Sequence, residues 1–191
     1  MLLLSEFISK NTAYLTQAEM QNNVRIIYPY FSALGWTDNA IAGMIGNMET
    51  ESTINPGLWQ GREIPADPFT TDKGFGLTQW TPANKLINWA NESGLDYTSG
   101  FVQMARINFE SLNNLQWSTN NIFNYTWEQF IHSTESPEDL AQVFVWAYER
   151  PENPDIDKRR RDARKWFEFF KRIRIPIWLL FKIKNGGSKR G

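Results

Sequence analysis

The chain has 191 residues, of which 41% are hydrophobic and 15% aromatic, and its formal net charge is −1. This composition excludes a disordered chain and allows one domain with a hydrophobic core. The absence of cysteine excludes disulfide bonds and thiolate chemistry, and the single histidine, His132, argues against zinc sites and a Ser-His-Asp triad, so we expect no metal and no cofactor.

Charge is distributed unevenly along the chain. Residues 158–191 include 13 basic and 2 acidic residues, whereas residues 1–157 include 7 basic and 19 acidic ones. This asymmetry predicts an acidic body with a basic tail. Residues 1–6 lack the basic start and long apolar core of a secretory signal, and no run of about 20 apolar residues predicts a membrane span.

The first predicted helix follows an N-terminal extension of 15 residues that shows no decisive period. Thr16 and Glu19 have the spacing of a capping box, which marks a helix start. An apolar stripe follows, and Gly35 is expected to end the helix. Pro29 is expected to kink this helix or divide it.

The second predicted helix carries an acidic residue beside an apolar stripe. It is expected to begin at Thr37 or Asp38, and its stripe consists of Ile41, Met44, Ile45 and Met48. Small residues beside the stripe, Ala42, Gly43 and Gly46, allow neighbouring helices to come close. Glu51 falls in the last turn at the edge of the stripe, before Asn55-Pro56-Gly57 stops the helix.

The rest of the chain is predicted to consist of an irregular segment, residues 57–80, called the broken segment, and then further helices. Glycine and proline interrupt residues 57–80 repeatedly, which predicts a small β-hairpin lobe. Helices are then expected from Thr81-Pro82 to Gly94, from Thr98 or Ser99, near residues 127–131, from Ser136 and from about Asp155. The predicted fold class is α+β, mostly helical, with one domain over residues 16–174 and a basic amphiphilic tail over residues 175–191.

Glu51 is the candidate general acid. A carboxyl group can protonate a glycosidic oxygen near neutral pH only if its pKa is raised. Three features predict a raised pKa for Glu51: the negative end of the helix dipole, burial beside the apolar stripe, and the charge of neighbouring Glu49. The alternative interpretation is an ordinary solvated glutamate at a helix end.

Several sequence blocks, in order, resemble the phage tail lysozyme family: Gly46-Asn47-Met48, residues 51–60, Gly74-Phe75-Gly76-Leu77, Gln79-Trp80-Thr81-Pro82 and Tyr148-Glu149-Arg150-Pro151. A Glu-Ser pair followed by Gly-Leu-x-Gln also resembles goose-type lysozymes and lytic transglycosylases. The resemblance covers about residues 16–170. It implies a lysozyme-like fold and a tail-tip peptidoglycan hydrolase of small podophages of Gram-positive hosts.

The resemblance implies roles for single residues. Glu51 takes the catalytic position, Gln79 matches the family's cleft glutamine, and Tyr148 is expected to face the same cleft. Sugar rings stack on aromatic side chains, so three more residues are predicted to bind substrate: Trp59, Phe75 and Trp80. The alternative is that half of these aromatic residues belong to the core.

The sequence does not identify a second catalytic carboxyl group. Retaining and inverting glycosidases place the partner at different separations, and the acidic residues of the broken segment, Glu63, Asp67 and Asp72, match no family block. We expect Glu149 and Arg150 to form an ion pair that fixes a helix end. A transglycosylase-like or inverting mechanism in which only Glu51 is essential stays open.

The basic tail has three interpretations: a solvated chain end, a segment on an anionic membrane surface, or a docking segment for another virion protein. No recognition motif predicts nucleic-acid binding. Many tail-tip members of the family carry a zinc endopeptidase domain, which this chain lacks the length and histidines to build. Cleavage of peptide cross-links is therefore not expected.

These observations predict cleavage of peptidoglycan glycan strands, of muramidase type, by a virion tail protein that acts at the host cell wall. The expected partners are peptidoglycan and other phage tail proteins. Two alternatives are a non-catalytic virion structural or wall-binding protein on a lysozyme scaffold, and an endolysin released at lysis.

Overall fold

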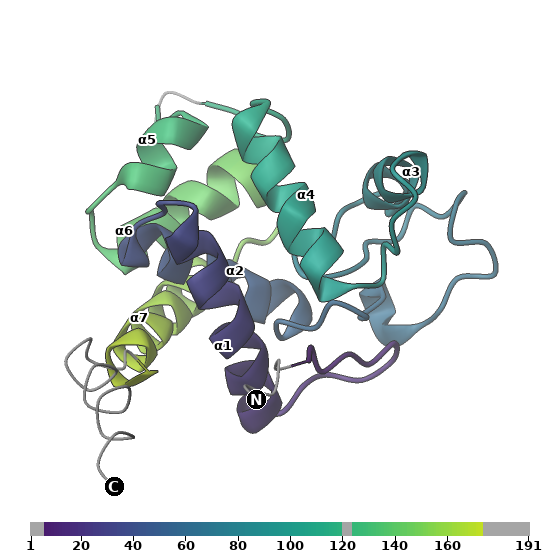
Figure 1. Ribbon diagram of the computed structural model, residues 1–191, viewed down its shortest axis with the longest axis horizontal. Helices are drawn as coiled ribbons and strands as arrows, with labels where there is room; N and C mark the ends of the chain where they lie inside the picture. Colours follow the sequence, from purple (N-terminus) through teal and green to yellow (C-terminus); the bar gives the residue numbers. More distant parts are fainter. Residues whose placement is uncertain (1–5, 120–123, 174–191) are drawn as a thin grey trace, which may run out of the picture.

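The computed structural model describes residues 6–119 and 124–173. Figure 1 shows α5, α6 and α7 on one side of the molecule, and α3 with the long loop that precedes it on the other. The α-helices of the described part are α1 (Gln17–Ala33), α2 (Asp38–Ser52), α3 (Asn84–Glu92), α4 (Gly100–Leu112), α5 (Trp127–His132), α6 (Pro137–Phe144) and α7 (Ile156–Ile173). A 3₁₀ turn, η1, covers Gln60–Arg62, and a π-helical turn, η2, covers Val145–Glu149.

The first helix confirms its predicted start. The Thr16 hydroxyl accepts a hydrogen bond from the Glu19 backbone N–H, and the Glu19 carboxylate accepts one from the Thr16 backbone N–H at 2.8 Å. Both halves of the capping box are therefore formed. Pro29 lies within α1 but does not divide it. Gly35 follows the end of the helix with a φ of 87°, a conformation that glycine adopts without steric cost.

Helix α2 is the central element and packs mainly against α6 and α7. Its side chains are buried without interruption from Ala40 to Met48. A Cβ atom on Gly43 would lie 2.9 Å from the backbone nitrogen of Ala141, and one on Gly46 would lie 2.6 Å from that of Ala163. The two glycines are thus what allows α6 and α7 to approach α2, as the sequence predicts.

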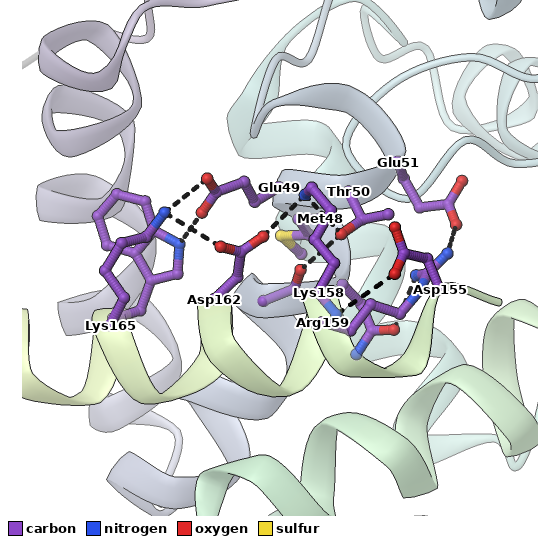
Figure 2. Close-up of polar contacts among 12 residues, drawn as sticks. Met48, Glu49, Thr50, Glu51, Asp155, Lys158, Arg159, Asp162 and Lys165 are labelled. Carbon is purple, nitrogen blue, oxygen red and sulfur yellow. Dashed lines mark hydrogen bonds and ion pairs between the residues drawn. The ribbon is translucent and has the colours of Figure 1, made fainter.

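Four basic residues of α7 pair with acidic residues of α2 and α6, as Figure 2 shows for the α2 side. The pairs are Arg159–Glu51 (2.5 Å), Lys165–Glu49 (2.6 Å), Arg160–Asp139 (2.8 Å) and Arg164–Glu138 (3.0 Å). Residues 158–173 therefore belong to the helical body, as the predicted domain bounds require, and several of their basic residues are paired with it. The predicted tail segment lies outside the described residues.

The loop between α2 and α3 corrects the β-hairpin prediction. It contains two isolated antiparallel bridges, Trp59–Phe75 and Phe75–Trp80, and no longer strand within the described part of the chain. Phe75 and Trp80 exchange backbone hydrogen bonds of 3.2 and 3.1 Å. Positive φ values at Gly61, Gly76 and Gln79 interrupt the extended backbone before a ladder can form.

The remaining helices follow their sequence signals, with one exception. Ser99, Thr126 and Ser136 stand at the N-cap positions of α4, α5 and α6. The exception is α3, which begins at Asn84 rather than directly after Thr81 and has Ala83 at its N-cap position. No helix in residues 6–119 and 124–173 is both long enough and apolar enough to cross a membrane.

The N-terminal extension is tied to the helical body by two buried asparagines. The Asn23 side chain exchanges hydrogen bonds with the backbone of Ile8 and donates one to the carbonyl oxygen of Ile54. The Asn55 side chain does the same for Lys10 and also donates to Ala13 O. Residues 8–13 therefore lie against the end of α2 and help to position Tyr14.

Candidate active site

The C-terminal end of α2 opens into a cleft of about 600 Å³. Glu51 lines the cleft together with residues 58–62 and 78–81 of the long loop and residues 148–152 after α6. Tyr14, Lys85 and Gln116 complete the lining. Three segments far apart in the sequence thus meet around the predicted catalytic residue.

Arg159 fixes the Glu51 carboxylate. Its Nη2 lies 2.5 Å from Oε1 of Glu51, its Nη1 donates to Oδ1 of Asn47 at 2.8 Å, and its Nε donates to the carbonyl oxygen of Pro154. The arginine is only 2% exposed, whereas the Glu51 side chain is 19% exposed. Glu51 therefore reaches the cleft with one oxygen held from behind by a buried guanidinium (Figure 2).

Asn47 continues this arrangement into the core. Its side-chain amide donates to the carbonyl oxygens of Gly43 at 2.8 Å and Ala141 at 3.0 Å, and both bonds are buried. Asn47 belongs to α2, Ala141 to α6 and Arg159 to α7. The position of Glu51 therefore depends on three packed helices and not on a loop.

Glu49 does not share the cleft with Glu51. Its carboxylate accepts hydrogen bonds of 2.6 Å from Lys165 Nζ and Trp166 Nε1. Figure 2 shows this contact at one end of the row along α7, with Glu51 at the other end. Glu49 is therefore paired with Lys165 of α7, and it is not among the residues that line the cleft.

Of the predicted substrate-binding residues, Gln79, Trp59, Trp80 and Tyr148 line the cleft, and Phe75 does not. Phe75 is 2% exposed, and its ring centroid lies 4.5 Å from that of Trp59. Trp59, Trp80 and Tyr148 are themselves no more than 4% exposed. These rings therefore form the base of the cleft and expose very little of their surface to it.

The Gln79 side chain is held by the loop that carries it. Its Nε2 donates to the carbonyl oxygens of Leu58 at 2.9 Å and Gly76 at 3.0 Å. Its backbone has a φ of 49°, in the left-handed region that side chains rarely adopt. Strain of this kind is common at binding sites, where the surrounding structure imposes it.

Beneath the base of the cleft, Glu110 of α4 accepts hydrogen bonds from three donors. Its carboxylate accepts hydrogen bonds from Trp80 Nε1 at 3.1 Å, Arg106 Nε at 2.8 Å and the Tyr148 hydroxyl. Burial raises the pKa of Glu110, and the three donors partly offset that rise. This network connects α4 with the two aromatic residues of the cleft base.

Glu149 also lines the cleft, and the structure corrects its predicted role. Arg150 donates to the carbonyl oxygens of Gln116 and Ala147, and no ion pair links it to Glu149 among the described residues. Oε1 of Glu149 is buried and has no hydrogen-bond partner. Burial raises the pKa of Glu149 well above its ordinary value of 4.5, and the charge of Glu51 raises it further, whereas Arg159 lowers it.

Tyr148 and Glu149 reach the cleft through the π-helical turn η2. Such turns widen the helix by one residue and are frequent at functional sites. The next residue, Arg150, has a φ of 52° and ends the turn. The extra residue of a π-helical turn cannot be recognised from a regular 3.6-residue period. The sequence therefore predicts that Tyr148 faces the cleft, but it wrongly predicts an ion pair between Glu149 and Arg150.

Sequence reasoning also missed Tyr14. This residue is 56% exposed, lines the cleft, and has the guanidinium carbon of Arg62 5.1 Å from its ring centroid. The acidic residues of the long loop lie elsewhere: Glu63 pairs with Lys73 at 3.0 Å, and Asp67 accepts a hydrogen bond from the Phe69 N–H. Residues 6–119 and 124–173 hold no group of three potential ligands placed to bind a metal ion.

A mostly helical domain whose aromatic-based cleft is lined by three glutamates, Glu51, Glu149 and Glu152, has the features of lysozyme-type proteins. The chain belongs to the phage tail lysozyme family, whose model matches residues 22–170, and this confirms the resemblance seen in the sequence. It is similar to Morphogenesis protein 1 of Bacillus phage B103, with 48% identity over 162 residues. The match covers 85% of this chain and 42% of that protein, so the chain spans about two-fifths of this relative's length.

Proposed function

We propose that the protein cleaves the glycan strand of bacterial peptidoglycan and that Glu51 is a catalytic carboxyl group of this reaction. One observation carries the proposal: the Glu51 carboxylate lines a cleft of about 600 Å³ and is fixed there by buried Arg159. Membership of the phage tail lysozyme family supports the same chemistry.

Cleavage breaks the bond between the anomeric carbon and the oxygen that links two sugars. The leaving oxygen must gain a proton, and positive charge develops on the sugar ring in the transition state. Glu51 is the general acid of this proposal and gives that proton, because it lines the cleft and its position is set before substrate arrives.

The same cleft provides contacts for a sugar chain. In this proposal Gln79, Trp59, Trp80 and Tyr148 contact the strand from the base of the cleft. Tyr14, the most exposed of the aromatic rings in the lining, offers an open face for stacking on a sugar ring. Phe75 supports Trp59 from below and has no direct contact in this account.

We further propose that the protein acts as a component of the phage tail, where it opens the host wall for DNA entry and has peptidoglycan and other tail proteins as partners. The family's description and the name of the B103 relative support a role in the phage particle. The alternative is that the protein is an endolysin, which carries out the same chemistry when the host cell lyses.

A second candidate function is a non-catalytic virion structural or wall-binding protein on the same scaffold. The observation that favours it is the name of the relative, a morphogenesis protein. This candidate predicts that the protein is retained by cell walls but produces neither new reducing ends nor anhydro-sugars.

The test compares Glu51→Gln with Glu49→Gln, two changes of the same kind made two residues apart. Purified peptidoglycan is incubated with each variant and with the wild type, and new sugar ends are measured. We expect Glu51→Gln to lose turnover by about 100-fold or more and Glu49→Gln to keep it. Equal turnover by Glu51→Gln and wild type, or no turnover by a folded wild type, contradicts the proposal.

A further inference from the structure

Arg62 and Lys85 are basic residues of the cleft lining to which the proposed function gives no role. Both side chains are exposed, and no ion pair joins either of them to an acidic residue within residues 6–119 and 124–173. Lys73 of the same long loop, by contrast, pairs with Glu63 at 3.0 Å. Two positive charges without acidic partners in a cleft are available to an anionic ligand.

The long loop fixes the backbone of Arg62. Its φ of 60° lies in the left-handed region, which costs free energy for a residue other than glycine. The Arg62 N–H donates to the carbonyl oxygen of Trp59 at 2.8 Å, and the Gln60 N–H donates to that of Gly74 at 2.9 Å. The loop therefore imposes a strained conformation at a residue of the cleft, as is common at binding sites.

The Arg62 side chain is directed to the exposed aromatic ring of the cleft. Its guanidinium carbon lies over the Tyr14 ring, 5.1 Å from the centroid. Tyr14 is fixed by the next residue, because the Leu15 N–H donates to Oγ1 of Thr53 at 2.9 Å. Thr53 is the C-cap residue of α2, two residues after Glu51. The Tyr14–Arg62 pair is thus tied to the same helix end that carries Glu51.

The charged residues of the cleft come from two parts of the fold. Arg62 belongs to the long loop and Lys85 to the first turn of α3, which lie on the same side of the molecule in Figure 1. Arg150 follows η2, and its guanidinium is engaged by backbone carbonyl oxygens. The acidic residues of the lining belong to α2 and to the segment after α6: Glu51, Glu149 and Glu152. The available positive charge of the lining therefore lies on the side of the long loop and α3.

We propose that Arg62 and Lys85 form a carboxylate-binding subsite, which makes the cleft select a glycan strand that carries carboxyl groups over a neutral glycan. This inference rests on the proposed glycan cleavage. Peptidoglycan can supply the carboxylate in two ways. The lactyl group of muramic acid is itself a carboxylate where no peptide is attached, and the stem peptide carries carboxylates where one is.

The two side chains suit this ligand in different ways. The Arg62 guanidinium can give two parallel hydrogen bonds to one carboxylate, whereas the Lys85 ammonium is a compact charge on a flexible chain. A sugar that stacks on Tyr14 would lie beside the Arg62 guanidinium. Because both groups are exposed and screened by solvent, we expect the two together to change affinity by about 10-fold, and less at high salt.

The experiment measures dissociation constants by calorimetry in the Glu51→Gln protein, which lacks the proposed acid and does not consume its ligand. Three ligands of equal sugar number are compared: peptidoglycan fragments with stem peptides, the same fragments after an amidase has freed the lactyl carboxylates, and neutral N-acetylglucosamine oligomers. We expect a carboxylate-bearing ligand to bind about 10-fold more tightly than the neutral one. Tighter binding of the first ligand alone assigns the subsite to the stem peptide, and tighter binding of the second assigns it to the lactyl group.

Further substitutions show whether the two basic residues cause this difference. Arg62→Gln together with Lys85→Gln should bring the carboxylate-bearing ligands to the affinity of the neutral oligomer, whose own affinity should stay within about threefold. Arg161→Gln together with Arg172→Gln removes the same charge from α7, outside the cleft, and should keep the discrimination. If the first pair of changes prevents folding, Lys85→Gln alone should lose part of the discrimination, since its exposed side chain has no polar partner in the described part of the chain.

Equal affinity for carboxylate-bearing and neutral ligands overturns the subsite, and so does discrimination that survives the loss of both basic residues. Turnover of peptidoglycan by the wild type is measured alongside. If the wild type cuts the strand while the binding measurements show no discrimination, the subsite is refuted and the proposed function stands. A folded wild type that neither binds nor cuts the strand contradicts both.

Discussion

Nη2 of Arg159 lies 2.5 Å from Oε1 of Glu51, although 108 residues of sequence separate them. The same guanidinium donates to Asn47, one turn earlier on α2, and to the backbone at Pro154. The contact joins the start of α7 to the end of α2 and fixes the carboxylate at the edge of the cleft (Figure 2). It is a positioning contact, since Arg159 does not line the cleft.

Arg159→Lys should separate positioning from charge. A lysine keeps the positive charge but cannot bridge three acceptors in the planar geometry of a guanidinium. We expect the variant to fold, to keep its KM for soluble glycan fragments within about threefold, and to lose kcat by about 10-fold or more because Glu51 is no longer fixed. Steady-state kinetics on glycan fragments test this.

Arg159→Ala is the harsher form of the same change. Removal of one partner from a buried ion pair typically costs about 3 kcal/mol or more, because the other charge is left uncompensated. Chemical denaturation should show this loss of stability, with Arg161→Ala on the exposed side of α7 as control. If Arg159→Lys keeps full kcat, the positioning role is refuted.

Gly46→Ala should destabilise the fold because α7 approaches α2 at this position. The added Cβ would lie 2.6 Å from the nitrogen of Ala163 and 2.8 Å from the carbonyl oxygen of Arg159, and neither backbone atom can move alone. Overpacking of this kind costs about 1–3 kcal/mol. Thermal unfolding measures it, and exposed Ser32→Ala on α1 should change stability by less than about 0.5 kcal/mol. An unchanged melting temperature for Gly46→Ala would show that the helices are not in contact there.

Glu149 should make the protein less stable as the pH rises. Its pKa is raised above the ordinary value of 4.5, so the folded state keeps a proton that the unfolded state loses above that pH. The free energy of unfolding therefore falls from about pH 4.5 upwards until the folded-state pKa is passed. Glu149→Gln should remove the part of this pH dependence that comes from Glu149. The part that comes from Glu110, whose pKa is also raised by burial, should remain. Parallel stability curves for wild type and Glu149→Gln across this range would contradict a raised pKa.

Tyr148→Phe should weaken the base of the cleft. The change removes the hydroxyl that donates to buried Glu110, which then loses one of three donors. We expect a loss of about 2 kcal/mol and a melting temperature lower by about 4–8 °C. Half-buried Tyr30→Phe on α1 is the control. A melting temperature for Tyr148→Phe that matches the control would show that the hydroxyl does not contribute.

The sequence predicts the helices well because their signals are local. Thr16 with Glu19, and Ser136 before Pro137, are caps that act within one turn, and the α2 stripe follows from spacing alone. The position of Glu51 in the last turn of α2 follows for the same reason. The β-hairpin prediction failed because the loop has positive φ values at its turns, among them Gly76, whose backbone packs against Gln103 of α4, and spacing does not encode such a contact.

The parts of the site that the sequence does not predict depend on contacts between distant segments. Arg159 and Glu51 become partners only after α7 packs on α2 through Gly46. Glu149 and Arg150 are adjacent in sequence, which suggested an ion pair, but the π-helical turn directs Arg150 to Gln116 O instead. The environment of an acidic side chain is a tertiary property, so a sequence pattern locates candidates without assigning their roles.

The most direct test of the account is mass spectrometry of the soluble fragments released from purified peptidoglycan by wild type and by Glu51→Gln. We predict that the wild-type protein releases glycan fragments with new reducing or anhydro ends and that Glu51→Gln, folded and still bound to the wall, releases none above background. Identical fragments from both proteins would contradict the claim that the Glu51 cleft is where the strand is cut.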